Sequence, residues 1–209
     1  MGRLVSVVGN SGVGKTTFAR NLCLGTNYQL GLEQHEERPF QELFMQHKRR
    51  YALANQIDYM LFRAQQEITI REGVHPGIQD GGLDQDFYVF TKLFFYNGYL
   101  SEDEYGICRR CYRVLRSSLP APELIIWMKA PVEIIVERYH RRARRLDITQ
   151  TEDMVVIEGL LENWLCKMPS ESVYVINSER EEQSYTDVIP AVRKLIESLN
   201  SGPISQISS

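Results

Sequence analysis

Short aliphatic runs alternate along the chain with longer stretches in which apolar residues recur at helical spacing. The first run, at residues 4–8, is rich in β-branched side chains, as is typical of a fully buried parallel strand. The predicted strands lie at 4–8, 28–33, 77–80, 124–128 and 173–176, and the predicted helices at 16–22, 39–72 with an interruption near 48–50, 84–98, 102–117, 132–145, 153–165 and 188–199. This alternation predicts an α/β sandwich of three layers, a five-stranded parallel sheet flanked by helices.

A single domain over residues 1–200 accounts for this pattern, because no repeat and no second set of elements interrupts it. The last residues, 201–209, are polar and predict a disordered tail.

A glycine-rich turn joins the first predicted strand to the first predicted helix. It reads Gly9-Asn10-Ser11-Gly12-Val13-Gly14-Lys15-Thr16 and matches G-x-x-x-x-G-K-[ST] at every fixed position. Between a strand and a helix, such a loop turns its backbone N–H groups toward phosphate oxygens. Lys15 brings an ammonium to the β- and γ-phosphates, and the Thr16 hydroxyl suits Mg²⁺. Residues 9–17, which include Thr17, therefore predict a site for ATP, or another nucleoside triphosphate, with Mg²⁺.

Composition and charge narrow the function classes. A chain of 209 residues with 43% hydrophobic content is long enough for one α/β core. The net charge of −3 gives no overall nucleic-acid signature, so a nucleic-acid partner is not expected. No apolar run approaches the ~20 residues needed to cross a bilayer. The first strand starts directly after residue 3, and the one C-x-x-C lacks a second ligand pair. We therefore expect no signal peptide, no membrane partner, ordinary thiols and a cytoplasmic location.

Several polar residues follow predicted strands or share one helix face. Glu33 ends the second predicted strand, where a carboxylate beside a phosphate site suits a general base; a solvated acidic turn is the alternative. Gln56, Tyr59 and Arg63 lie at helical spacing and suit a planar heterocycle, although an exposed polar stripe has the same spacing. Asp80 ends the third strand and suits Mg²⁺ or its water.

The segment from Arg138 to Arg145 holds five arginines in eight residues. Arg138 and Arg142 project together at i and i+4. Phosphoryl transfer is catalysed largely by positioning and by cations on the transferring oxygens. An arginine-rich lid at about 139–152 is therefore favoured over a solvated basic helix or an RNA-binding patch.

In their order and spacing, these motifs resemble the deoxynucleoside kinase family, in particular its short bacterial deoxyadenosine, deoxycytidine and deoxyguanosine kinase branch. The resemblance extends from the glycine loop to about Asn177 and includes Trp164-Leu165. It implies a P-loop kinase fold and, in that family's usual form, a homodimer. The residues that it assigns are Glu33 as the base for the sugar 5′-hydroxyl, Gln56, Arg63 and Asp86 as readers of the nucleobase, Phe90 or Tyr59 as a stacking ring, and Arg138, Arg142, Arg144 and Asp147 as lid residues.

Four positions depart from the family pattern. Gly81 replaces the arginine of a [DE]-R-S segment, which in the family contacts phosphate and the general base. Gln34 replaces a proline, Met45 a tyrosine that commonly touches the sugar 3′-hydroxyl, and Asp147 a glutamate that closes the lid. These departures indicate either a divergent kinase or a chain that has lost activity.

The interpretation that accounts for most of these motifs is transfer of the γ-phosphoryl group of ATP to the 5′-hydroxyl of a deoxynucleoside in nucleotide salvage. The alternatives are a nucleoside monophosphate kinase, a nucleotide-binding regulatory protein with a degenerate acceptor site, and an RNA-binding protein. A monophosphate acceptor normally requires an additional arginine near the third strand, where this chain has Gly81.

Overall fold

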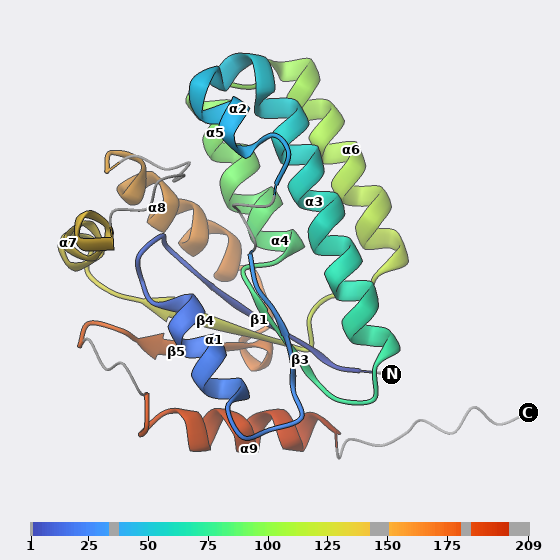
Figure 1. Cartoon of the computed structure of the whole chain (residues 1–209), viewed down its shortest axis with the longest axis vertical. Helices are drawn as coiled ribbons and strands as arrows, with labels where there is room; N and C mark the ends of the chain where they lie inside the picture. The colour runs from blue at the N-terminus through green and yellow to red at the C-terminus, as the bar shows by residue number, and fades with distance from the viewer. Residues whose placement is uncertain (1, 34–37, 143–150, 181–184, 201–209) are drawn as a thin grey trace, which may run out of the picture.

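A computed structural model of the chain describes residues 2–33, 38–142, 151–180 and 185–200 (Figure 1). At its centre lies a sheet of parallel strands in the order β2-β3-β1-β4-β5. The strands are β1 Leu4–Gly9, β2 Gln29–Gly31, β3 Gly77–Asp80, β4 Leu124–Lys129 and β5 Val173–Asn177. The predicted five-stranded parallel sheet is confirmed, and every residue of the central strand β1 is buried.

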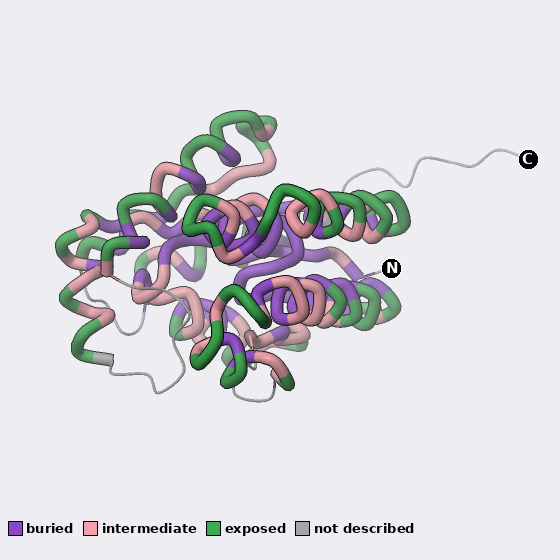
Figure 2. Tube along the Cα trace, turned by 90° about the horizontal axis from the view of Figure 1, so that it is seen from above, coloured by how far each residue is buried: buried purple, intermediate pink, exposed green. Residues whose placement is uncertain are grey.

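Helices cover both faces of this sheet and give the three layers (Figures 1 and 2). They are α1 Lys15–Cys23, α2 Gln41–Gln46, α3 Lys48–Glu72, α4 Leu83–Gln85, the π-helix η2 Asp86–Thr91, α5 Lys92–Tyr96, α6 Glu102–Ser118, α7 Val132–Arg142, α8 Asp153–Leu165, the 3₁₀-helix η3 Ser170–Ser172 and α9 Ile189–Asn200. None of the helices within the described residues is long and apolar enough to cross a membrane.

Alternate residues of β1 serve opposite layers, as the two-residue period of a strand requires. Val7 lies in an apolar cluster with side chains of α1 and α9, whereas Val8 lies in a cluster with side chains of η2, α5 and α8. A third cluster joins α2, α3, α5 and α6, with Phe44 of α2 stacked on Phe94 of α5. These helices form the upper lobe of Figure 1.

Two predicted elements differ from the structure. The strand predicted at 28–33 pairs only over Gln29–Gly31, because β2 is an edge strand whose neighbour β3 has only four residues. The helix predicted at 84–98 consists of α4, η2 and α5 in succession. Its π turn is stabilised at the Asp86 carbonyl, which accepts hydrogen bonds from Thr91 Oγ1 at 2.9 Å and from Gln56 Nε2 at 2.8 Å.

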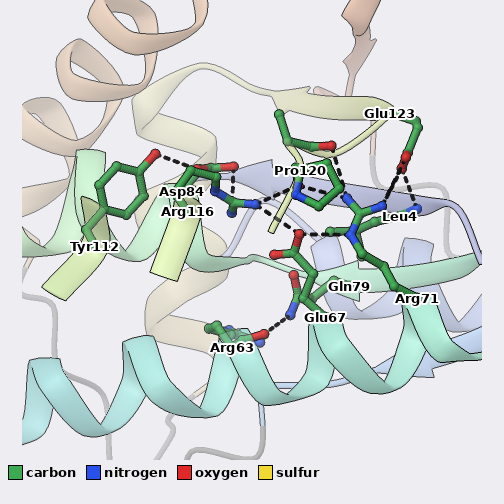
Figure 3. Close-up of polar contacts among 11 residues, drawn as sticks. Leu4, Arg63, Glu67, Arg71, Gln79, Asp84, Tyr112, Arg116, Pro120 and Glu123 are labelled. Atoms are coloured by element: carbon green, nitrogen blue, oxygen red, sulfur yellow. Dashed lines mark hydrogen bonds and ion pairs between the residues drawn. The ribbon is translucent and has the colours of Figure 1, made fainter. Parts of the chain in front are cut away.

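A buried ion-pair network runs along the contact between α3 and α6 (Figure 3). Glu67 Oε1 of α3 lies 3.2 Å from Arg71 Nε and 2.9 Å from Arg116 Nη1. Arg116 also reaches Asp84 of α4 at 3.2 Å, and the same carboxylate accepts a hydrogen bond from the Tyr112 hydroxyl at 2.7 Å. The network therefore joins α3, α6 and the short helix that follows β3.

At its other end the network reaches the amino ends of the strands (Figure 3). Arg71 Nη1 lies 3.0 Å from Glu123 Oε1, and Glu123 Oε2 accepts a hydrogen bond from the backbone N–H of Leu4 at 2.7 Å. Arg71 Nη2 donates to the carbonyls of Pro120 and Ala121. One guanidinium thus fixes the start of β1 and the segment that leads into β4.

Removing the shared carboxylate of this network should strongly destabilise the fold. We expect Glu67→Leu to lower the free energy of unfolding by about 3–5 kcal/mol, because the buried guanidinium of Arg71 and the half-buried one of Arg116 lose their common anion. Urea unfolding followed by circular dichroism measures this change. The control is Lys129→Ala, which breaks an exposed ion pair with Glu162 and should cost at most about 1 kcal/mol. Equal losses in the two variants would contradict the assigned role of Glu67.

Candidate active site

The glycine loop lies at the carboxyl edge of β1, where it turns into α1. Gly14 is the residue before α1 and has φ +106°, and its Cα faces the hydroxyl of Tyr185. Gly12 has φ +84°, and a Cβ there would lie 3.1 Å from the Ile135 carbonyl of α7. Larger residues at these two positions would be strained in the backbone and crowded by neighbouring chain. The glycines therefore let the loop lie close to α7.

Two buried amide side chains hold this loop in place. Asn10 Nδ2 donates to the Met154 carbonyl of α8 at 2.8 Å, while its Oδ1 accepts from the Ser11 N–H at 2.9 Å. Gln85 of α4 exchanges two hydrogen bonds with the backbone of Gly9, one at 3.2 Å and one at 3.1 Å. The start of the loop is therefore fixed from both α8 and α4. Sequence analysis missed Gln85, since no pattern distinguishes a glutamine that contacts a distant loop.

The two side chains predicted for triphosphate and Mg²⁺ follow the loop. Lys15 Nζ donates to the carbonyls of Gly9 at 3.0 Å and Asn10 at 2.9 Å. Thr16 Oγ1 donates to Asp80 Oδ2 at 2.6 Å. The other oxygen of this buried carboxylate, Oδ1, has no hydrogen-bond partner among the described residues. Burial raises the pKa of Asp80, and the attraction of Lys15 opposes that shift only in part.

The polar stripe of α3 is buried. Gln56, Tyr59 and Arg63 are only 2–4% exposed, which contradicts the alternative of a solvated surface stripe. Gln56 donates to the Asp86 carbonyl, and Arg63 Nε lies 3.4 Å from Asp86 Oδ2. The Tyr59 hydroxyl is buried and makes no hydrogen bond within the part of the chain that the structure describes.

Glu33 lies just beyond β2, and its charge acts on residues of three other elements. It raises the pKa values of Asp80 at the end of β3, of Asp86 in η2 and of Arg63 and Tyr59 in α3. These five residues therefore share one site at the carboxyl edge of the sheet, which is where open α/β sheets bind ligands.

Asp86 is the most perturbed carboxyl group in this set. Burial raises its pKa from 3.8 to about 7, although the Arg63 guanidinium opposes the shift. The pKa of Arg63 is raised in turn, because the negative charges of Asp86 and Glu33 outweigh the effect of its own burial. Phe90, one turn after Asp86, is buried in the apolar cluster that η2 and α5 form with β4 and α8.

The arginines at the end of α7 are only partly described. Arg138 donates to the carbonyls of Ser178 at 2.7 Å and Glu179 at 3.0 Å, so its guanidinium contacts the segment after β5. The side chain of Arg142, and Arg144 and Asp147 with most of the predicted lid, lie outside the described residues.

The parallel α/β sandwich, with its glycine loop between the central strand and the first helix, is the fold of the P-loop kinase class. Within that class the sequence matches the deoxynucleoside kinase family over residues 5–197, and the chain belongs to this family. Membership supports a kinase that phosphorylates a nucleoside.

Curated and solved relatives agree with this family. The chain is 24% identical over 200 residues to the deoxyadenosine/deoxycytidine kinase of Bacillus subtilis (strain 168), covering 90% of this chain and 92% of that protein. It is 23% identical over 141 residues to the deoxyguanosine kinase of the same strain, with 67% of each chain covered. The solved deoxyadenosine kinase of M. mycoides with bound dATP has the same fold, with a TM-score of 0.78 at 16% identity over 92% of this chain and 99% of that one.

The raised pKa of Asp86 predicts a pH dependence of stability. Between about pH 4 and pH 7 the folded protein keeps a proton on Asp86 that the unfolded chain has released, so this residue makes the fold less stable as pH rises through that range. We expect the free energy of unfolding to fall more steeply with pH in the wild type than in Asp86→Asn. Urea titrations at pH 5, 6, 7 and 8 measure the two slopes. Parallel curves would show that Asp86 titrates normally.

Proposed function

We propose that this protein transfers the γ-phosphoryl group of ATP to the 5′-hydroxyl of a deoxynucleoside. The observation that carries the proposal is the convergence of two residue sets at one edge of the sheet. The loop of residues 9–17 lies after β1, and the charge of Glu33 reaches Asp80, Asp86 and Arg63 beside it. Family membership and the names of the Bacillus subtilis relatives support the same acceptor class.

On the donor side, Lys15 neutralises the β- and γ-phosphates. Its present partners are two loop carbonyls, which phosphate oxygens would replace. The oxygens of Thr16 and Asp80 fit Mg²⁺, because one carboxylate oxygen is buried without a partner among the described residues and Mg²⁺ prefers oxygen ligands. When bound, Mg²⁺ would offset charge on the transferring phosphoryl group.

On the acceptor side, Glu33 accepts the proton of the 5′-hydroxyl group. At the same time the oxygen of that hydroxyl group forms a bond to the γ-phosphorus. The bond from that phosphorus to the bridging oxygen breaks, and ADP leaves. Arg138, Arg142 and Arg144 neutralise the developing charge, and Asp147 closes the lid. For Arg138 this role requires release from the carbonyls of Ser178 and Glu179.

The nucleobase is read from α3 and η2. Gln56 uses one N–H of its Nε2 on the Asp86 carbonyl, so its amide oxygen and its second N–H are the groups that we assign to a base. Asp86 and Arg63 contribute a carboxyl group and a guanidinium beside it. Tyr59, with its buried hydroxyl, or Phe90 supplies a ring face.

The proposed base gives a first activity test. We expect Glu33→Gln to lower kcat by at least about 100-fold while the Kd for ATP changes less than about threefold, because the amide cannot take up the proton. Purified protein with Mg-ATP is assayed against deoxynucleosides, ribonucleosides and monophosphates. Glu42→Gln, on the exposed side of α2, is the control. Turnover of monophosphates alone would indicate a monophosphate kinase, and ATP binding without any product would indicate a regulatory protein.

The predicted Mg²⁺ site gives a second test. Asp80→Asn keeps the size and shape of the side chain but removes its negative charge. We expect it to raise the Mg²⁺ concentration for half-maximal activity about 10- to 100-fold. Thr69→Val, an exposed change on α3, should leave the Mg²⁺ titration unchanged. An unaltered titration in Asp80→Asn would remove this carboxylate from the metal site.

A further inference from the structure

The turn after β3 contains no arginine of its own, but the guanidinium of Arg63 from α3 lies against it. Gly81 and Gly82 have φ of +86° and +141°, and neither carries a side chain. A Cβ at Gly81 would lie 2.9 Å from Arg63 Nη2 and 3.5 Å from its Cζ. The guanidinium of α3 therefore lies directly against the backbone of this turn, in the space that a side chain at position 81 would enter.

Arg63 is also tied to the residue before Glu33. Its Nη1 donates to Gln66 Oε1 at 3.3 Å, and Gln66 Nε2 donates to the Leu32 carbonyl at 2.7 Å. Gln79 of β3 contacts both residues. Its Nε2 donates to Gln66 Oε1 at 3.2 Å, and it donates to the Arg63 carbonyl at 3.1 Å (Figure 3). Gln66 thus fixes the Arg63 guanidinium relative to the backbone at Leu32, which precedes Glu33.

The contact with Asp86 alone does not account for this arrangement. Charge-assisted N–H···O contacts are usually 2.7–2.9 Å long and often bidentate, whereas the Arg63 contact with Asp86 is single and 3.4 Å long. The Nη2 of Arg63 lies against the backbone of Gly81. The charges of Glu33 and Asp80 act on Arg63 in addition to that of Asp86.

We propose that Arg63 is a positioning residue for the general base: from α3, it supplies the cation that holds the Glu33 carboxylate beside the Asp80-Gly81-Gly82 turn. This inference rests on the proposed function, because it gives Glu33 its catalytic role. With glycine at position 81 the tip of the guanidinium keeps its place against the turn, whereas a side chain there would require that tip to shift. Arg63 then serves the reacting hydroxyl as well as the nucleobase.

The test compares Arg63→Gln, Arg63→Lys and Asp86→Asn in deoxynucleoside kinetics. If Arg63 positions Glu33, Arg63→Gln lowers kcat about 100-fold for every accepted base, while Arg63→Lys, which keeps the charge, recovers at least tenfold of that loss. Asp86→Asn keeps the cation, so its main effect is on KM and on the choice of base. A rise in KM alone in Arg63→Gln, with kcat unchanged, would overturn the proposal.

The pH profile of kcat separates positioning from structural damage. The groups whose pKa values Glu33 influences are Arg63 and Tyr59 of α3, Asp80 at the end of β3 and Asp86 of η2. Loss of the cation in Arg63→Gln should move the acid limb of the kcat profile to higher pH. Loss of a negative charge in Asp86→Asn should not move that limb to higher pH. An acid limb that stays in place in Arg63→Gln would contradict the role.

Two further measurements keep the result decisive. ATP binding, measured by calorimetry, reports folding of each variant independently of the acceptor side. Gln66→Leu removes the link to Leu32 without changing charge, and we expect it to lower kcat about tenfold at unchanged KM. If the wild type itself phosphorylates no nucleoside, the proposed function is wrong. If the wild type is active and only the Arg63 and Gln66 predictions fail, the proposed function stands and the inference about Arg63 is wrong.

Discussion

Gln85 exchanges two hydrogen bonds with the backbone of Gly9, and the arrangement of the site depends on this buried contact. The residues on either side of Gln85 point to different partners. Asp84 binds Arg116 and Tyr112 of α6, and Asp86 lies against Arg63 of α3. Three consecutive residues therefore fix the glycine loop, the ion-pair network and the residues proposed to read the nucleobase relative to one another. Loss of the amide would remove the side-chain partner of the Gly9 N–H in a protein interior, which is costly, whereas the Gly9 carbonyl would keep its hydrogen bond from Lys15.

The buried carboxylates Glu67 and Asp86 differ in the length and number of their ion pairs. Around Glu67 the ion pairs are 2.9–3.2 Å long and connect elements that must stay fixed. Around Asp86 the one ion pair is 3.4 Å long, and burial outweighs it enough to raise the carboxyl pKa to about 7. Burial also raises the pKa of Glu67, in spite of its two guanidinium partners, so the raised pKa of Asp86 reflects burial first and its single long contact second. The long contact leaves Asp86 less tightly held than Glu67, which is compatible with the proposed role of Asp86 toward a nucleobase.

The sequence predicted the parts of this fold that follow from local pattern. The five strands, the glycine loop and the long helices follow from β-branched runs, a fixed motif and helical periodicity. The π turn at Asp86–Thr91 was not predicted, because it is stabilised by Gln56, which is thirty residues away. The same limit applies to Gln85 and Gln66. Their partners are backbone groups of distant loops, and no local spacing identifies such contacts.

Gly81 looked like a defect in the sequence because it replaces a cation of the family pattern. The structure changes that interpretation, since the missing side chain and the Arg63 guanidinium would need the same space. Glycine also lets the turn adopt a positive φ at this position, which other residues adopt only with strain. Arg63 is held there by Gln66 and Gln79 through side-chain and backbone hydrogen bonds. The family pattern already has an arginine at this position of α3, so under the inference above Arg63 serves Glu33 in addition to the nucleobase and is not a charge relocated from the turn.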